Sequence, residues 1–374
     1  MAKTPKTVSD EDLAAEFERL FGGNDEQSTV KQWLDTGYAP LNHALSSRYD
    51  GGMPVGRMVE MFGPPSSGKT AIATGVMASA QKMGGIAGFS DHEHSFSMAL
   101  APNLGLNIKP GRFIYKKPRT FEDSLTLCIK TVEYVRTKEL IPASAPIAWV
   151  FDCLAAMVPQ SKLFDAKTGA RRDADSYNMH DNTALARATS AAFPAFAQMI
   201  EELDVLAVFL NQQRTKPGVM YGDPTTTPGG DAPKFYASTR IQLGAQRITK
   251  GQGADAQVLG SLIGAKVVKN KCARPFLKAS WRFLYQPDGS GKFDTVGSMI
   301  DFLVANKLIE EPTKGRVTWD GKALFKSQVA EIVEREGRLP ELLALLPKTA
   351  EPVVEIPEGA EGAWDDSDAP ADAA

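Results

Sequence analysis

Short apolar runs alternate along most of the chain with longer segments in which apolar side chains recur at helical spacing. The apolar runs predict buried strands over Met58–Phe62, Ile86–Ser90, Pro146–Phe151 and Val205–Leu210. The segments between them predict helices over Lys69–Lys82, Phe121–Arg136 and Thr183–Glu202. Strands that alternate with helices in this way indicate an α/β fold with a mostly parallel central sheet.

The pattern changes on both sides of this region. Close-spaced strands, expected to be antiparallel, are predicted over Ile241–Ile248, Leu262–Asn270 and Phe276–Tyr285. Short helical segments over Asp301–Leu308 and Lys326–Glu336 then predict a small C-terminal domain. Near the N-terminus, Ser9–Asp12 forms a capping-box pattern, and apolar positions at helical spacing follow at Leu13, Phe17, Leu20 and Phe21. This end of the chain therefore predicts one short amphipathic helix.

Charge is unevenly distributed. Residues 351–374 hold eight acidic residues and no Lys or Arg, so leaving them out changes the net charge from −3 to +5. Such a tail either competes with polyanions for a basic surface or is a disordered, solubilising end. The sequence contains no apolar stretch of about 18 residues and no secretory signal pattern. Its three cysteines show no CxxC pairing. We therefore expect a cytoplasmic protein without a membrane segment.

The first predicted strand runs into a loop that fits the pattern GxxxxGK[ST]. The loop consists of Gly63, Pro64, Pro65, Ser66, Ser67, Gly68, Lys69 and Thr70. Such a loop surrounds phosphates with backbone N–H groups, and the helix that follows adds its positive N-terminal dipole. Lys69 is expected to reach the β- and γ-phosphates, and Thr70 to bind Mg²⁺. Asp152 ends a buried strand, as expected of a carboxylate that orients Mg²⁺ and its waters. The sequence therefore predicts an ATPase that binds ATP with Mg²⁺.

Hydrolysis also needs a group that orients the attacking water. Asp91 and Glu93 both follow the strand at Ile86–Ser90, where side chains face the ligand crevice of a parallel sheet. His92 and His94 interleave with them, but consecutive side chains point in opposite directions in extended chain. A shared metal ion is therefore not expected here, and both carboxylates remain candidates.

Beyond these motifs, the chain from about Gly37 to Glu310 resembles the RecA family of ATP-dependent homologous-recombination proteins. The resemblance includes Gly56–Glu60 before the phosphate loop, Asp91–His94, Phe209–Arg214, Lys216–Ser238 and Val267–Lys271. It implies that Glu93 is the base and that Gln212 senses the γ-phosphate. It also implies that Lys269 and Lys271 reach across a subunit interface to a neighbour's ATP.

The resemblance further places DNA-binding loops near residues 160–181 and 213–230. The candidate DNA-binding residues are Arg171, Arg172, Arg187, Arg214, Lys216, Tyr221, Gly229, Gly230 and Lys234. Cations beside flexible glycines suit contact with a phosphate backbone without base reading. A solvated charge pair of Arg171 and Arg172 with Asp173 and Asp175 is an equal alternative.

Three features depart from the bacterial pattern. The segment Gln160–Asp181 is longer and carries additional cations, Cys153 stands where a hydroxyl is usual, and Leu100 stands where an aromatic ring is expected over adenine. These departures leave the expected ATPase unchanged. They are typical of a phage-encoded or accessory recombinase, which would work in the host cytoplasm.

The resemblance implies a DNA-dependent ATPase that forms filaments on single-stranded DNA and promotes pairing and strand exchange with double-stranded DNA. Single-strand-binding or loader proteins are further expected partners. The corresponding division is 1–36 for an oligomerisation helix and linker, 37–298 for the ATPase core, 299–350 for a small α+β domain and 351–374 for the tail. A helicase with the same core and a recombination mediator or regulator remain the alternatives.

Overall fold

The computed structural model describes residues 9–21, 29–165, 167–177, 181, 183–215, 225–251 and 256–347. Lys216, Tyr221 and the acidic tail at 351–374 lie outside these residues. The chain divides into two compact units, Met1–Val30 and Lys31–Ala374.

The first unit contains helix α1, Asp10–Phe21. The backbone N–H of Asp12 donates to Ser9 Oγ, which is one of the two hydrogen bonds of a capping box. The Asp12 carboxylate accepts from the Ser9 hydroxyl. The apolar side chains of this helix are exposed, with 40% of Leu13, 54% of Phe17 and 57% of Leu20 accessible.

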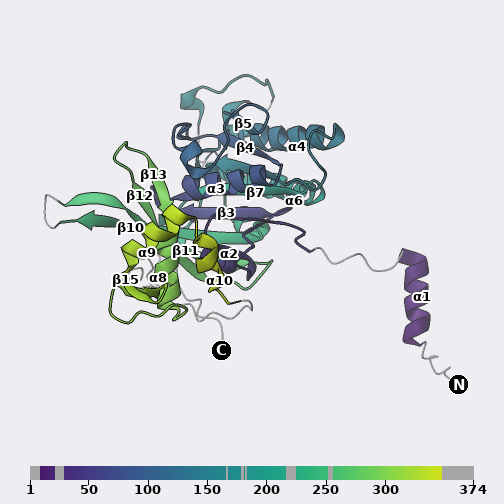
Figure 1. The fold of residues 1–374 in the computed structure, drawn as a ribbon. Coiled ribbons are helices and arrows are strands. Elements are labelled where there is room, and N and C mark those ends of the chain that lie inside the picture. The colour runs from purple at the N-terminus through teal and green to yellow at the C-terminus, as the bar shows by residue number, and fades with distance from the viewer. Residues whose placement is uncertain are drawn as a thin grey trace. The chain divides into compact units, whose positions relative to one another are not determined.

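The second unit is built on a nine-stranded sheet with the order β13-β12-β11-β10-β3-β7-β6-β4-β5 (Figure 1). Parallel pairing joins β10, β3, β7, β6, β4 and β5, and antiparallel pairing joins β10 to β13 through β11 and β12. The strands of the parallel part are β3 Met58–Gly63, β4 Ile86–Asp91, β5 Phe113–Lys116, β6 Ile147–Asp152 and β7 Val205–Gln212. Those of the antiparallel part are β10 Thr239–Lys250, β11 Gln257–Asn270, β12 Lys278–Tyr285 and β13 Gly291–Asp294.

Helices cover both faces of the parallel part. They are α3 Lys69–Lys82 on one face, and α4 Phe121–Thr137 and α6 Ala184–Glu202 on the other. Strand β7 shows why residues 205–210 are all apolar. Leu206, Val208 and Leu210 pack in the core on the α3 side, whereas Val205, Ala207 and Phe209 pack in the core on the α4 and α6 side. The expected mostly parallel α/β sheet is thereby confirmed.

Smaller elements complete the unit. They are β1 Trp33–Leu34, α2 Ala39–Ser46, β2 Met53–Pro54, α5 Gln160–Leu163, β8 Arg214–Thr215, β9 Thr225–Thr226 and α7 Ala232–Tyr236. The C-terminal elements are α8 Thr295–Ala305, β14 Arg316–Trp319, β15 Lys322–Phe325, α9 Lys326–Glu336 and α10 Leu339–Ala344.

Helix α8 begins earlier and ends earlier than the predicted Asp301–Leu308. It begins earlier because Asp294 caps its first turn by accepting a hydrogen bond from the Gly297 N–H at 2.9 Å. Buried residues of α8 and α9 belong to the same apolar cluster as α3. The proposed domain boundary at 299 falls inside α8 and stays a proposal. No helix within the described ranges is long and apolar enough to cross a bilayer.

Candidate nucleotide site and surrounding loops

The GxxxxGK[ST] loop connects β3 to α3 at the carboxyl end of the sheet, as its pattern predicts. Two of its glycines are needed for shape. A Cβ on Gly63 would lie 2.3 Å from the Leu243 carbonyl oxygen. Gly68 has φ of +87°, a conformation that side chains disfavour. At these two positions no side chain covers the backbone, so its N–H groups can approach an anion closely.

Lys69 lies over this loop. Its Nζ donates to the carbonyl oxygens of Gly63 at 3.1 Å and Pro64 at 2.8 Å. Burial lowers the pKa of Lys69, and Asp152 opposes that change. A phosphate entering the loop would offer this ammonium group a charged partner in place of two carbonyls.

Thr70 and Asp152 meet beside the loop, where Thr70 Oγ1 donates to Asp152 Oδ2 at 3.1 Å. Burial and then the charge of Glu93 raise the pKa of Asp152 to about 7. A buried carboxylate held near other acids is stabilised by a cation, and hydroxyl and carboxylate oxygens are ligands that Mg²⁺ accepts. The residues present therefore fit the predicted magnesium site.

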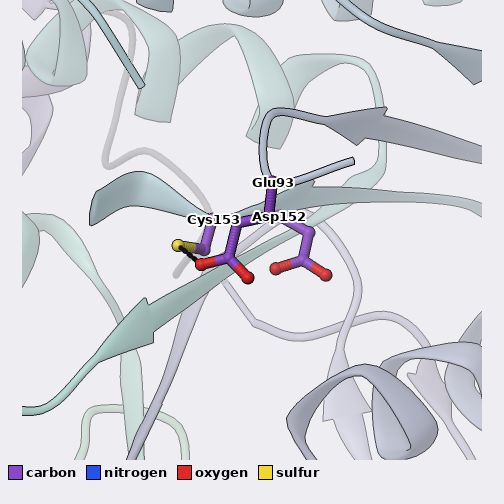
Figure 2. Close-up of side chains that lie close together, drawn as sticks. All are labelled: Glu93, Asp152 and Cys153. Carbon is purple, nitrogen blue, oxygen red and sulfur yellow. Dashed lines mark hydrogen bonds between the residues drawn. The ribbon is translucent and has the colours of Figure 1, made fainter. Parts of the chain in front are cut away.

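Glu93 lies directly beside Asp152 and Cys153, as Figure 2 shows. Its Oε1 accepts hydrogen bonds from Cys153 Sγ at 2.5 Å and from Gln212 Nε2 at 2.6 Å. Burial, followed by Glu93, raises the pKa of the Cys153 thiol to about 12, so the thiol acts as a donor. The ends of β6 and β7 thus hold this carboxylate on one oxygen.

The second candidate base is placed differently. Asp91 is fully buried and accepts hydrogen bonds from the His94 N–H and the Tyr115 hydroxyl, both at 2.7 Å. His92 bonds Ser124, and burial lowers the pKa of His92 to about 4. Among the described residues, neither histidine belongs to a group that could hold a metal ion. Asp91 and the histidines therefore organise the turn, while Glu93 faces the nucleotide cavity.

The nucleotide cavity has a volume of about 350 Å³ and contains the residues that carry the expected chemistry. Its lining includes Lys69, Thr70, Glu93, Asp152 and Gln212. Leu100 also lines it, as the resemblance implies.

Sequence reasoning missed a second wall of this cavity. Ser261 and Ile263 of β11 and Phe283 and Tyr285 of β12 line it. Each pair occupies positions i and i+2 of a strand and so shares one face of the sheet. The alternation of side chains along each strand could be read from the sequence. The strand pairing that brings β11 and β12 next to the phosphate loop could not.

Asn211, which precedes Gln212 in β7, contacts the second candidate DNA loop. Its side-chain Nδ2 donates hydrogen bonds to Glu60 Oε1 at 2.8 Å and to the Pro228 carbonyl oxygen at 3.0 Å. Thr189 Oγ1 donates to the Gly229 carbonyl at 2.7 Å. Gly229 and Gly230 both have positive φ, and a Cβ on Gly230 would lie 2.8 Å from Ala186 Cβ. The far end of this loop is therefore held against β7 and α6.

The residues expected to contact DNA lie at several places around the two loops. Arg214, Gly229 and Gly230 line a cavity of about 500 Å³, which we call the loop cavity. Arg172 pairs with Asp181 at 2.8 Å, rather than with Asp173 or Asp175, and lies 5.3 Å from the Tyr177 ring.

Two of the remaining candidates have local partners. Arg187 Nη1 donates to Thr183 Oγ1 at 2.8 Å, and Lys234 pairs with Asp231 at 3.1 Å. Arg171 lines a third cavity, which is described below.

Lys269 and Lys271 lie at the end of β11 and do not line the nucleotide cavity of their own chain. Both donate to the Phe235 carbonyl, Lys269 at 2.8 Å and Lys271 at 3.3 Å. Burial, with Lys271 and Arg240 nearby, lowers the pKa of Lys269 to about 8. Their place is compatible with action on another protomer's site.

Comparison with known proteins agrees with this geometry. The family model of the RecA N-terminal domain matches residues 18–290. Protein RecA of Heliobacterium modesticaldum is 36% identical over 302 residues, covering 79% of this chain and 78% of that protein. Protein RecA of Symbiobacterium thermophilum is 36% identical over 309 residues, covering 80% and 79%. Protein RecA of Chloroherpeton thalassium is 36% identical over 282 residues, covering 74% and 69%. The chain belongs to the RecA family of recombinases, DNA-dependent ATPases that promote homologous pairing and strand exchange.

Proposed function

We propose that this recombinase binds MgATP at Gly63–Thr70 and couples its hydrolysis to DNA held by the two loops. One observation carries this proposal: Gln212 donates to Glu93 at one end of the nucleotide cavity while its neighbour Asn211 donates to Pro228 in the second loop. Adjacent residues of one strand therefore contact the hydrolytic carboxylate and the loop.

Each polar group of the nucleotide cavity has a proposed task. Backbone N–H groups of the loop and Lys69 bind the phosphates. Thr70 and Asp152 would hold Mg²⁺, which neutralises charge on the phosphate oxygens. Glu93 orients water for in-line attack on the γ-phosphorus, and Gln212 reports whether that phosphate is present. Ordering of the second loop by Gln212 would make DNA binding depend on ATP.

Assembly completes the proposed site. Lys269 and Lys271 of one protomer stabilise transition-state charge at the next protomer's ATP, a task performed by arginine fingers in other phosphoryl-transfer enzymes. The exposed apolar face of α1 is proposed to pack on a neighbouring protomer in a helical filament. Packing on its own domain is the alternative.

The proposed DNA surface combines Arg171, Arg172, Arg187, Arg214, Lys216, Tyr221, Gly229, Gly230 and Lys234. It would bind single-stranded DNA first and double-stranded DNA as the pairing partner. Work with single-strand-binding or loader proteins in the cytoplasm completes the proposal.

ATP hydrolysis with and without long single-stranded DNA tests this assignment. We would compare the wild type, Lys69→Ala and the control Lys82→Ala, which removes a lysine at the far end of the same helix. Strong DNA stimulation in the wild type and control, lost in Lys69→Ala, supports the proposal. Equal hydrolysis with and without DNA in the wild type contradicts the coupling.

A further inference from the structure

A third cavity, of about 390 Å³, adjoins the Glu93 segment. Glu93 lines the nucleotide cavity, whereas the residues before and after it, His92 and His94, line this one. Lys117, Arg119 and Arg171 also line it, and we call it the basic cavity. The basic cavity therefore joins three segments: the turn that carries Glu93, the connection from β5 to α4, and the first DNA loop.

The charge of the basic cavity is not neutralised within the described part of the chain. Lys117, Arg119 and Arg171 are exposed, and none of them forms an ion pair with a described carboxylate. Lys117 Nζ lies 5.8 Å from the centroid of the Tyr115 ring. Three cations around one hollow create a field that attracts an anion.

Two carboxylates that lie on or directly beside the segments lining the basic cavity, Asp91 and Glu122, already accept hydrogen bonds within the protein. Both oxygens of Asp91 accept hydrogen bonds from the backbone or from Tyr115. Glu122 Oε2 accepts a hydrogen bond from the Gln160 N–H at 2.8 Å. Neither carboxylate lines the basic cavity. An external anion is therefore the natural partner of Lys117, Arg119 and Arg171.

The position of the basic cavity indicates which anion. Ala156 and Val158 line both the basic cavity and the loop cavity, which also contains Arg214, Gly229 and Gly230. Helix α5 is shared in the same way, because Lys162 lines the loop cavity and Leu163 the basic cavity. A polyanion seated at the loops can pass over this wall with successive phosphates on either side.

We propose that the basic cavity binds a phosphodiester of the DNA strand held by the loops, with Lys117 and Arg119 as additional DNA-binding residues. A phosphate there contacts the segment on both sides of Glu93 and so provides a second connection between DNA and the hydrolytic carboxylate, separate from Gln212. This inference rests on the proposed function, because it requires that the loops bind DNA.

The test compares binding of a labelled single-stranded oligonucleotide, with a non-hydrolysable ATP analogue, across a salt series. The variants are Lys117→Ala/Arg119→Ala and the charge-matched control Lys109→Ala/Lys130→Ala, whose lysines are exposed and lie outside the basic cavity. Each phosphate contact to a single strand contributes about 0.7 to the slope of log affinity against log salt. Loss of two contacts should flatten that slope by about 1.4, and the control should keep the wild-type slope.

Two further measurements separate the sources of phosphate. A fluorescent ATP analogue and inorganic phosphate are titrated against the same variants, and thermal unfolding checks that they fold. A flattened DNA slope, with a reduced ratio of DNA-stimulated to DNA-free hydrolysis, supports the inference. An unchanged DNA slope in a folded double variant overturns it, as does weaker ATP-analogue or phosphate binding without a change in DNA slope. A wild type that does not bind the oligonucleotide overturns the proposed function as well.

Discussion

The Cys153 thiol donates a hydrogen bond to Glu93 Oε1 at 2.5 Å. Cys153 directly follows Asp152, whose carboxylate accepts a hydrogen bond from Thr70. Glu93 Oε1 also accepts a hydrogen bond from Gln212 at 2.6 Å. With both donors on one oxygen, the second oxygen of Glu93 is left to face the nucleotide cavity. The thiol therefore positions Glu93, and it does so at the position where a hydroxyl was expected.

Removing this donor should slow hydrolysis more than it weakens nucleotide binding. We expect Cys153→Ala to lower DNA-stimulated kcat by about ten- to a hundredfold, since a hydrogen bond to a charged group is worth about 1.5–3 kcal/mol and each 1.36 kcal/mol is a factor of about ten in rate. Cys153→Ser retains a donor and should restore most of the rate. Steady-state kinetics separates kcat from KM, and equal rates for the alanine and serine variants would show that the hydrogen bond is not needed.

A buried ion pair joins three strands next to the phosphate loop. Glu60 is 1% exposed, and its carboxylate accepts hydrogen bonds from Arg240 at 2.6 Å and Asn211 at 2.8 Å. Arg240→Ala leaves that carboxylate buried with one partner fewer and should cost about 3–5 kcal/mol of unfolding free energy. Arg247→Ala, at an exposed position of the same strand, should cost less than about 0.5 kcal/mol. Denaturant unfolding measures both, and similar losses would contradict the importance of the pair.

Strands β3, β4, β6 and β7 of the parallel half could be predicted from the sequence because they are buried on both faces and read as continuous apolar runs. Helices Lys69–Lys82 and Lys326–Glu336 have the predicted bounds for a similar reason, since turn signals mark their ends. Strand β5 was missed, because it lies at the edge of the sheet and is only partly buried. The phosphate loop, Asp152 and Glu93 follow from motifs that are local in sequence. Their presence around one cavity agrees with that prediction.

Contacts between distant strands were not predictable in this way. The wall formed by Phe283 and Tyr285 depends on which strands pair, and apolar periodicity does not specify pairing. The basic cavity depends on three loops that meet only in the folded chain. Strand position alone left Asp91 and Glu93 equivalent, and the family resemblance favoured Glu93. In the structure, Asp91 is hydrogen-bonded to Tyr115 and the His94 backbone, whereas Glu93 lines the nucleotide cavity.

The lowered pKa of Lys269 predicts a pH dependence of assembly. Its ammonium group loses its proton as pH rises through about 8, so the free protomer presents less positive charge to a neighbour's phosphates. ATP-dependent filament formation should therefore weaken above about pH 8. Lys269→Arg keeps its charge and should remove this decline, whereas Lys266→Arg on the same strand should not. Sedimentation or light scattering from pH 7 to 9 measures assembly.

Unfolding does not explain such a decline. The folded-state pKa of Lys269 lies below its ordinary value of 10.5, so the folded protein binds fewer protons than the unfolded chain between about pH 8 and 10.5. The contribution of this group to unfolding free energy therefore rises with pH across that window. A decline that persists unchanged in Lys269→Arg would assign it to another group.

Helix α1 offers a separate test of assembly. Because residues 1–30 form a unit apart from residues 31–374, deleting residues 1–24 should leave the core folded and abolish filaments on DNA with ATP. Substituting Phe17 and Leu20 by alanine should reproduce the defect, and Arg19→Ala should not. Electron microscopy detects filaments, and circular dichroism checks the fold. If filaments persist after the deletion, the apolar face of α1 is not needed for the contact between protomers.

The nucleotide cavity draws its walls from two differently built halves of the sheet. The residues proposed to bind phosphate and orient water lie at the carboxyl ends of the parallel strands and at the start of α3, whereas Phe283 and Tyr285 lie on an antiparallel strand. Substitutions in the antiparallel strands can thus change one wall of the cavity while Lys69 and Glu93 stay unaltered. The cavity is therefore made of two sets of residues from different parts of the sheet, and each set can be substituted while the other keeps its sequence.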